Sequence, residues 1–509
     1  MQPVLTPEEM GAADRATIAA GTPSHSLMER AGRAVAQVAV GMAGGAYGRR
    51  ILVVCGRGNN AGDGFVSARL LADWGAYPVV ACLHGPDELS GDALTNFHKL
   101  KNIRRFRSEP IRFARELAQC DLVVDALFGT GFRGSLTGPA ADAVNAINAR
   151  RRPVLAVDIP SGVNGATGEI AGPAIHADVT VTMAARKLGL LLYPGSAAAG
   201  RIEVVDIGIA MPSPPAVAGM PEEGDVAAAL GPRPLDAHKR SVGTVLVVAG
   251  SRGMMGAAAL ATRAALRAGA GLAALATIRS VASAQDLGVL EATTLGLPET
   301  AEGTLGAGSV APVLARAEGV SAVAIGPGLT AAPQTAEAVR ALAQQLGRPL
   351  VLDADGLNAI AGDTDILAAR LAPTVVTPHP GELSRLLQTS TAAIQADRLG
   401  SATTAARLLH AVVVLKGYRS IVASPGGEVA VVTTGGPALA TGGTGDVLTG
   451  VTVAFLAAGL APFTAAWAAA WVHGRAGDVL AQRIGVRGTL AGDLPDAVAG
   501  VLRELEGAW

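Results

Sequence analysis

Short continuous runs of apolar residues recur along the chain, and each ends in a segment rich in glycine and polar residues. Strands of a parallel sheet are buried on both faces and read as continuous apolar runs, whereas amphipathic helices show an apolar residue every three to four positions. Stretches with the helical spacing separate the runs, so the pattern predicts an α/β fold of doubly wound parallel sheets. The predicted strands are residues 50–55, 77–83, 121–126 and 153–158 in the first half, and 244–249, 322–325, 349–352, 374–376 and 412–415 in the second.

Two helices are predicted before the first strand. Thr6-Pro7-Glu8-Glu9 is typical of a helix start, with a capping residue, a proline at the first helical position and acids that complement the helix dipole. The second helix is predicted at about 26–42. After the first strand, the glycine-rich stretch 56–64 is expected to form a loop and residues from about 65 to 74 a helix.

The chain is too long for one domain, because single hydrophobic cores stop growing at about 250–300 residues and this sequence has 509. Residues 210–224 hold four prolines among small residues, which is typical of a linker. We therefore predict an N-terminal Rossmann-like domain at 1–212, a linker at 213–224 and a second doubly wound domain at 225–509.

The composition agrees with alanine- and glycine-rich α/β layers: half of the residues are hydrophobic, 3% are aromatic and 65 are glycine. A formal net charge of −1 without a basic cluster argues against a nucleic-acid-binding protein. Cys55, Cys82 and Cys120 lie at spacings unlike those of a metal site and are interpreted as buried small hydrophobes of a reducing compartment.

The sequence also bears on location. The N-terminus carries Glu8 and Glu9 and lacks an apolar core, so it is not expected to be a signal peptide. Residues 447–472 include no charged residue, and the stretch is long enough to span a bilayer. Glycines and Pro462 interrupt this stretch, which favours two short buried helices with a turn at 459–462. We expect a soluble cytoplasmic protein that forms a homo-oligomer.

The stretch 438–450 carries the most distinctive chemistry. Gly442, Gly443 and Gly445 allow positive φ and a close approach to a ligand, and the apolar residues that follow predict a helix whose free N–H groups face an anion. Asp446 lies at that positive end. Its carboxylate would repel a phosphate unless it takes a proton from an attacking hydroxyl, so Asp446 is either a general base or a helix N-cap.

Three polar segments in the first half, 56–64, 125–135 and 158–163, follow predicted strands, where parallel sheets bind their ligands. Residues 1 to about 212 resemble the NAD(P)H-hydrate epimerase domain. The matching motifs are Leu27-Met28-Glu29-Arg30-Ala31-Gly32, Gly58-Asn59-Asn60-Ala61-Gly62-Asp63-Gly64, Asp125-Ala126-Leu127-Phe128-Gly129-Thr130-Gly131, Asp158-Ile159-Pro160-Ser161-Gly162-Val163-Asn164 and Lys187-Leu188-Gly189-Leu190. One departure is Ala61, where the family usually has glycine.

The epimerase resemblance implies a set of site residues. Asn60, Asp125 and Ser161 are implied to coordinate a potassium ion. Epimerisation needs proton transfer as a carbon–oxygen bond breaks and reforms, and Asp158 is the expected acid/base. Lys187 either assists it or is a solvated lysine at a strand end. The residues implied to hold the hydrated nicotinamide nucleotide are Asn59, Asn60, Ala61, Gly62, Asp63, Gly129, Thr130, Gly131, Phe132, Arg133, Gly134, Ser135 and Asp158.

The second half resembles the ribokinase-like superfamily, and within it the ADP- or ATP-dependent NAD(P)H-hydrate dehydratases. The matching segments are Gly326-Pro327-Gly328-Leu329, Asp353-Ala354-Asp355-Gly356, His379-Pro380-Gly381-Glu382, Lys416-Gly417 and 438–450. The resemblance implies that Ala257, Gly328, His379 and Asp446 bind the hydrated nucleotide. It implies that Lys416, Gly417, Tyr418, Arg419, Ser420 and Gly445 bind the adenine nucleotide. Asp353 and Asp355 either support a magnesium ion through water or cap a strand end.

Together the two resemblances imply a fused enzyme that repairs hydrated NADH and NADPH. The N-terminal domain would interconvert the R and S hydrates, and the C-terminal domain would dehydrate the S hydrate with ADP, giving AMP and phosphate. Hydroxide leaves poorly and a phosphate ester leaves well, so Asp446 would deprotonate the hydroxyl while the amides of 443–445 hold the phosphoryl group. The alternative is a small-molecule kinase whose first half is a non-catalytic binding module. The sequence does not decide between ADP and ATP.

Overall fold

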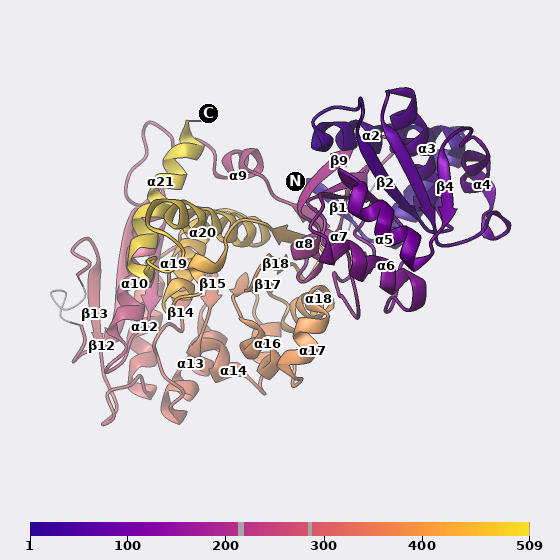
Figure 1. Cartoon of the computed structure of the whole chain (residues 1–509). Coiled ribbons are helices and arrows are strands. Elements are labelled where there is room, and N and C mark those ends of the chain that lie inside the picture. Colours follow the sequence, from indigo (N-terminus) through magenta and orange to yellow (C-terminus); the bar gives the residue numbers. More distant parts are fainter. Residues whose placement is uncertain (212–217, 283–287, 508–509) are drawn as a thin grey trace. The chain divides into compact units, whose positions relative to one another are not determined.

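The structure, a computed structural model, describes residues 1–211, 218–282 and 288–507. The chain forms two compact units, one of Pro3–Val217 and one of Met1–Gln2 with Ala218–Trp509 (Figure 1). The predicted linker 213–224 lies partly outside the described residues. Its described part holds the strand β10 (Ala218–Met220) and the start of the helix α9 (Glu223–Leu230), and β10 pairs with β19 (Val429–Val432) of the second unit.

The first unit is built on a sheet in which all neighbouring strands are parallel. The four strands predicted from apolar runs are confirmed. Three further strands, β4, β7 and β9, complete the sheet. The order across it is β4 (Arg104–Arg107), β3 (Tyr77–Cys82), β2 (Arg50–Cys55), β5 (Leu122–Ala126), β6 (Val154–Val157), β7 (Val179–Met183) and β9 (Arg201–Val205).

Alternate residues of the central strand β2 enter different cores. Ile51 and Val53 pack in a cluster with residues of α2 and α3, whereas Leu52 and Val54 pack in a cluster with residues of α5 and α6. Side chains alternate across a strand, so helices cover both faces of the sheet and the doubly wound arrangement is confirmed. The helices of this unit are α1 (Pro7–Ala19), α2 (Ser24–Ala43), α3 (Asn59–Asp73), α4 (Gly91–His98), α5 (Pro110–Gln119), α6 (Gly138–Ala149), α7 (Leu188–Leu191) and α8 (Gly195–Ala198).

The predicted loop at 56–64 is wrong over most of its length, because α3 begins at Asn59. The glycines here serve close packing rather than positive φ. A Cβ on Gly62 would lie 2.5 Å from Met28 Sδ, and one on Gly64 would lie 2.6 Å from Ala126 Cβ. The Gly64 contact brings α3 down onto β2 and β5, and the Gly62 contact brings α3 against α2. They outweigh the low helix propensity of the sequence Asn-Asn-Ala-Gly-Asp-Gly.

The second unit has a mixed sheet with a parallel body. Its order is β13 (Thr293–Leu297), β12 (Leu272–Ile278), β11 (Thr244–Val248), β14 (Ala322–Ile325), β15 (Leu350–Leu352), β16 (Thr374–Val376), β17 (Val412–Leu415), β18 (Ser420–Ala423), β19 and β10. The five predicted strands are confirmed. The pairs β17–β18 and β18–β19 are antiparallel, so the chain turns back directly after β17. The segment that joins β17 to β18, residues 416–419, therefore stays at the carboxyl edge of the parallel strands.

Helices cover both faces of this sheet, with α20 and α13 on opposite sides of the strands in Figure 1. The helices are α9, α10 (Met255–Arg267), α12 (Val310–Ala317), α13 (Pro333–Gln345), α14 (Asp355–Ile360), α15 (Asp365–Ala368), α16 (Pro380–Leu386), α17 (Thr391–Ala396), α18 (Arg398–Leu409), α19 (Thr444–Ala457), α20 (Pro462–Ile484) and α21 (Leu494–Glu506). The apolar stretch 447–472 forms α19 and the first half of α20, as predicted, although α20 is longer than expected. None of the helices in the described residues is long and apolar enough to cross a membrane.

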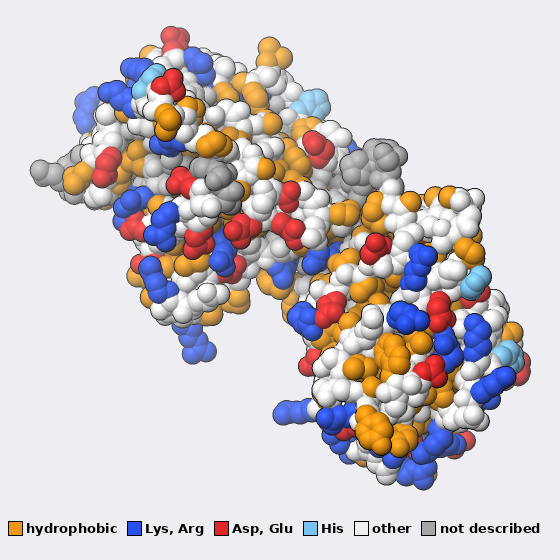
Figure 2. Space-filling view, turned by 90° about the horizontal axis from the view of Figure 1, so that it is seen from above, with side chains coloured by type: hydrophobic (Ala, Val, Ile, Leu, Met, Phe, Trp, Pro, Cys, Tyr) orange, Lys and Arg blue, Asp and Glu red, His pale blue; other side chains and the backbone are white. Residues whose placement is uncertain are grey.

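Charged side chains of both signs are mixed on the side of the molecule seen in Figure 2, where Lys and Arg are interspersed with Asp and Glu. This distribution agrees with the near-zero net charge of the sequence.

Candidate active sites

The glycine-rich stretch of the second unit forms the start of α19, as predicted. Gly443 is the N-cap residue with φ of +94°, and no side chain caps the helix. A Cβ on Gly443 would lie 2.7 Å from Leu260 Cδ1, so both the backbone conformation and the packing require glycine. Asp446 lies in the first turn and is not the N-cap. The N–H groups at the start of this helix therefore face outward as a candidate anion site.

The surroundings of Asp446 favour a proton acceptor. Burial and the nearby Asp353 carboxylate raise the pKa of Asp446 to about 6, while the Lys416 ammonium opposes this rise. Among the described residues, none donates a hydrogen bond to its side chain. A carboxylate with this pKa is ionised at neutral pH and is a stronger base than an ordinary aspartate.

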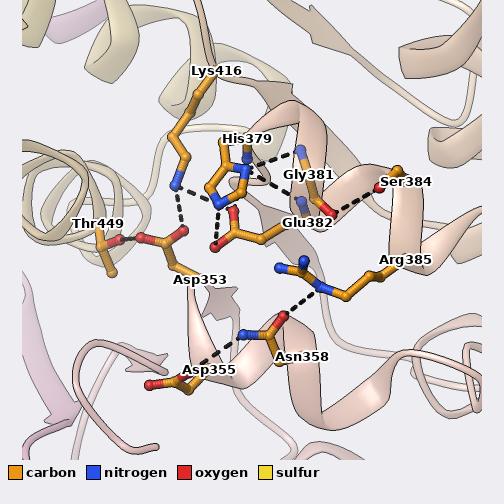
Figure 3. A network of polar contacts seen from close by, with 10 residues as sticks. All are labelled: Asp353, Asp355, Asn358, His379, Gly381, Glu382, Ser384, Arg385, Lys416 and Thr449. Atoms are coloured by element: carbon orange, nitrogen blue, oxygen red, sulfur yellow. Dashed lines mark hydrogen bonds and ion pairs between the residues drawn. The ribbon is translucent and has the colours of Figure 1, made fainter. Parts of the chain in front are cut away.

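Lys416 forms a polar network with Asp353 and Glu382 (Figure 3). Its Nζ is 2.7 Å from Asp353 Oδ1 and 3.7 Å from Glu382 Oε2. Thr449 Oγ1 donates to the other oxygen of Asp353 at 2.7 Å. Burial lowers the pKa of Lys416, but the two carboxylates outweigh this effect and raise it. A Cβ on Gly445 would lie 3.4 Å from Lys416 Nζ, so the ammonium group contacts the first turn of α19 directly.

The His379-Pro-Gly-Glu382 motif forms a reciprocal helix cap. His379 Nδ1 accepts hydrogen bonds from the N–H groups of Gly381 and Glu382, and Glu382 Oε2 accepts one from His379 N at 2.7 Å. Because Nδ1 is an acceptor, the neutral ring carries its proton on Nε2. The ring is half exposed. His379 Nε2 lies 3.5 Å from Glu382 Oε1, and Glu382 Oε2 lies 3.7 Å from Lys416 Nζ, so the glutamate connects the ring to Lys416.

The two neighbouring acids Asp353 and Asp355 have different hydrogen-bond partners. Asp353 is buried and bound to Lys416 and Thr449, whereas Asp355 accepts a hydrogen bond from Thr330 N at 2.8 Å and from Asn358 at 3.3 Å. Arg385 in turn donates to Asn358 at 3.0 Å. Ala354 between them has φ of +48° and caps α14 without a side chain. Non-glycine residues held at positive φ cluster at functional sites. A water-mediated magnesium site at these acids stays a prediction.

A pocket of about 340 Å³ adjoins Lys416 and the start of α19. Five of the six residues expected to bind the adenine nucleotide line it, namely Lys416, Gly417, Tyr418, Ser420 and Gly445. Arg419 does not; its guanidinium donates to Thr433 O and lies over the Tyr418 ring. His473 also lines the pocket, and its Nε2 lies 2.9 Å from Thr444 O. Burial lowers the pKa of His473 to about 4, so the ring is neutral.

The structure also brings Ala257 and Gly328 together. Gly328 has φ of +64°, and a Cβ there would lie 3.1 Å from Ala257 Cβ and 2.8 Å from Met254 O. The turn after β14 therefore packs against the start of α10. Both segments leave the same edge of the sheet as Lys416 and Asp353.

The first unit holds a pocket of about 810 Å³. Of the expected site residues, those that line it are Asn59, Asn60, Asp63, Gly129, Thr130, Gly131, Phe132, Arg133, Asp158 and Lys187. Ala61 and Gly62 are buried in the core, and neither they nor Gly134 and Ser135 line the pocket. Apolar residues from α2 and from the segment after β9, including Leu27, Met28, Ile207 and Ile209, form part of the wall. The pocket is large enough for a dinucleotide fragment.

Asp158 and Lys187 form a buried ion pair in this pocket. Asp158 Oδ1 lies 2.7 Å from Lys187 Nζ, and Asp158 Oδ2 accepts a hydrogen bond from Thr130 N at 3.2 Å. Lys187 also donates to Thr182 Oγ1 and Met183 O, and only 1% of it is exposed. The alternative of a solvated lysine is therefore wrong. Asp158 has φ of +67°, a strained backbone of the kind found at functional sites.

Two further carboxyl groups share the pocket with the ion pair. Burial raises the pKa of Asp63 well above its usual range, and the Asp158 charge raises it further. Burial also raises the pKa of Asp14, on α1, although the Lys187 charge opposes this rise. Sequence reasoning missed Asp14, whose helix position gives no sign that it faces a pocket. The site thus places two carboxyl groups with raised pKa beside the Asp158–Lys187 pair.

Of the three residues implied to bind potassium, Asn60 lines the pocket, whereas Asp125 and Ser161 are buried and hydrogen-bonded to each other. The fully buried Asp125 accepts hydrogen bonds from Ser161 N at 2.8 Å, Ser161 Oγ at 2.7 Å and Leu127 N at 3.2 Å. Burial raises its pKa to about 6, and the Ser161 hydrogen bonds only partly offset this. Asn60 is buried, and its Nδ2 has no partner among the described residues. Carboxylate, amide and hydroxyl oxygens beside an unneutralised buried acid fit a hard cation.

Comparison with known proteins gives matches in both units. Residues 245–499 match the family model described as NAD(P)H-hydrate dehydratase, and residues 24–189 match that of the YjeF-related protein N-terminus. The bifunctional NAD(P)H-hydrate repair enzyme Nnr of Moorella thermoacetica is 44% identical over 516 residues, which cover 99% of this chain and 97% of that protein. The Escherichia coli K12 protein of the same name is 35% identical over 93% of this chain and 88% of that protein.

Among solved structures, the ADP/ATP-dependent NAD(P)H-hydrate dehydratase of Bacillus subtilis, co-crystallised with ATP/Mg²⁺, is similar to the second unit. It is 32% identical, covers 56% of this chain and 98% of its own, and gives a TM-score of 0.49.

Proposed function

Since the chain belongs to the family of bifunctional NAD(P)H-hydrate repair enzymes, we propose how its two sites carry out the two reactions. The first unit is the epimerase and the second is the dehydratase. The observation that carries the dehydratase assignment is the position of Asp446, a carboxylate with raised pKa in the first turn of a glycine-capped helix. Domain boundaries at 1–212, 213–224 and 225–509 and a homo-oligomeric state remain proposals.

In the dehydratase, Asp446 takes the proton from the hydroxyl of the S hydrate. The hydroxyl oxygen then attacks the terminal phosphorus of ADP and AMP departs. The N–H groups around Gly443–Gly445 stabilise the charge on the transferred phosphoryl group. The new phosphate ester is a good leaving group, pushed out by the ring nitrogen. With loss of a proton from the neighbouring carbon it leaves as phosphate and NADH or NADPH is restored.

The other site residues of this unit bind and orient the nucleotide and the hydrate. The segment from Lys416 to Ser420 and Gly445 hold the adenine nucleotide, and Ala257, Gly328 and His379 hold the hydrate. A magnesium ion supported by Asp353 and Asp355 would neutralise charge on the phosphates when bound. Because Lys416 is held by Asp353 and Glu382, its ammonium is fixed in place before the nucleotide arrives.

In the epimerase, Asp158 is the base and Lys187, 2.7 Å away, holds it in place. A carboxyl group that retains its proton, Asp63 or Asp14, donates to the departing hydroxyl, which leaves as water while the ring nitrogen stabilises the cation. Water adds to the opposite face and Asp158 takes its proton. Burial raises the pKa of Asp63 and of Asp14, which suits either carboxyl group to the role of the acid. A potassium ion at Asn60, Asp125 and Ser161 would offset the buried charge of Asp125.

The rival function is a small-molecule kinase with a non-catalytic first half. A kinase would convert the alcohol into a stable phosphate ester, and reduced nicotinamide absorbance would not return. Purified S hydrate with magnesium and either ADP or ATP separates the two: the repair function predicts that absorbance returns only when a nucleotide is present. A stable phosphorylated hydrate as the end product would refute it.

The pH dependence of the same reaction tests the role of Asp446. A base with a pKa of about 6 is active when ionised, so kcat/KM should be constant above about pH 7 and fall about tenfold per pH unit below pH 6. An unperturbed aspartate, with a pKa near 3.9, would hold the rate to about pH 4. The profile is measured after subtraction of the enzyme-free rate. A profile flat to pH 5 would remove Asp446 as the base.

A further inference from the structure

Arg398, the first residue of α18, is buried directly behind the nucleotide segment 416–420. Its NH1 donates to Tyr418 O at 2.7 Å, and its NH2 lies 3.3 Å from Leu415 O and 3.5 Å from Lys416 O. Only 8% of the residue is exposed. Three carbonyl groups of the turn between β17 and β18 are thus gathered on one guanidinium.

The turn is shaped around this guanidinium. Gly417 has φ of +146°, and a Cβ there would lie 2.9 Å from Arg398 NH2 and 3.1 Å from NH1. Any other residue would therefore displace the arginine as well as strain the backbone. Gly417 also lines the nucleotide pocket. The arginine and the pocket thus adjoin the same residue.

The charge of Arg398 is not neutralised. No carboxylate of the described residues forms an ion pair with it, whereas Lys416 is paired with Asp353 and Glu382. A buried guanidinium without an acid partner is costly, and within the described part of the chain its hydrogen-bond partners are backbone carbonyls. A polyanion bound against the turn would complete that compensation.

We propose that Arg398 is the positioning residue of the adenine-nucleotide site: it fixes the Lys416–Tyr418 turn and supplies positive charge that favours the nucleotide phosphates. The inference rests on the proposed nucleotide-dependent dehydratase. Arg398 is expected to act on nucleotide affinity rather than on the chemistry at Asp446. Loss of the guanidinium should therefore raise KM for the nucleotide and leave KM for the hydrate unchanged.

Arg370 is a matched control in the same unit. It is likewise a partly buried arginine whose guanidinium donates to backbone carbonyls, those of Ala343, Leu346 and Arg348, and which has no acid partner among the described residues. Burial lowers the pKa of both arginines to about 10. Its carbonyl partners lie outside the nucleotide segment. Substitution of Arg370 should therefore reduce stability, as substitution of Arg398 does, without weakening nucleotide binding.

The experiment compares Arg398→Lys, Arg398→Met and Arg370→Met in the full chain. Calorimetry with ADP and with ATP gives Kd, and steady-state kinetics give KM for nucleotide and hydrate separately. Hydrogen bonds to charged groups contribute enough that both Arg398 variants should bind nucleotide about tenfold or more weakly, Met more than Lys, with kcat changed less than threefold. Arg370→Met should lose a similar amount of thermal stability and keep its nucleotide Kd.

Three results would overturn either the role of Arg398 or the dehydratase function. Equal nucleotide Kd in wild type and both Arg398 variants overturns the inference while leaving the dehydratase function intact. Equal weakening by Arg398→Met and Arg370→Met shows a general stability effect and also overturns it. A wild-type chain that binds neither ADP nor ATP overturns the proposed dehydratase function itself. Epimerase activity of each variant, measured on the same sample, reports whether the first unit is still folded.

Discussion

Replacing Asp446 with asparagine is expected to reduce the dehydration rate by between about a hundredfold and ten-thousandfold, the range that a positioned general base contributes. Asparagine keeps the size of the side chain but cannot accept the hydroxyl proton. The helix start is unaffected, because Gly443 and not Asp446 caps α19. The loss should appear in kcat, with nucleotide Kd changed little, and is measured as return of reduced-nicotinamide absorbance from S hydrate and ADP.

Asp496→Asn is the matched control. Asp496 is the third residue of α21, as Asp446 is the third of α19, and it pairs with the exposed Arg263 and Arg267 on the surface. The same change of charge at the same helical position should leave the rate within about twofold, because surface ion pairs contribute little. A rate in Asp446→Asn within tenfold of wild type would contradict the role of Asp446 as base.

The second large effect is expected in the epimerase from Asp158→Asn. Without the carboxylate, interconversion of the R and S hydrates should fall by about a hundredfold or more, while dehydration of pure S hydrate continues at the wild-type rate. Removing Asp158 also leaves Lys187 buried without its partner, which typically costs about 3–5 kcal/mol of stability. Part of the loss could therefore come from unfolding of the first unit.

The double variant Asp158→Asn, Lys187→Met separates these two causes. It removes the stranded buried charge along with the base, so stability should recover relative to Asp158→Asn while epimerisation stays absent. Thermal unfolding and hydrate interconversion, followed by separation of the two epimers, give the two readouts. Epimerisation that returns together with stability would show that Asp158 serves the fold and not the reaction.

The strands of both sheets were largely predictable from sequence, because a buried parallel strand is a continuous apolar run. The runs at 50–55, 322–325, 374–376 and 412–415 match strands of the structure. The edge strand β4, Arg-Arg-Phe-Arg, was missed because only Phe106 is buried. The expected loop at 59–64 is helical, because contacts of Gly62 and Gly64 with neighbouring elements override local propensity.

Site residues that belong to a sequence motif were predictable, whereas residues whose role depends on burial in the fold were not. The segments holding Asp446 and Asp158 were found from their glycines and acids, and the segment holding Lys416 from its resemblance to the dehydratase family. Asp14 and Arg398 lie on helices with nothing nearby in the sequence to mark them. Their importance comes from what the fold brings against them, an ion pair in one case and three carbonyl groups in the other. The capping role of His379 likewise needs the geometry of α16.

The central claim is that one chain repairs both epimers of the hydrated cofactor. The most direct test supplies an equilibrated mixture of R and S hydrates of NADH with ADP and magnesium, and follows the return of reduced-nicotinamide absorbance to completion. Full recovery at an enzyme-limited rate is the predicted result, since the first unit would convert R hydrate into the S hydrate that the second consumes. Recovery that stops near the S fraction, and then continues only at the spontaneous rate, would contradict the claim.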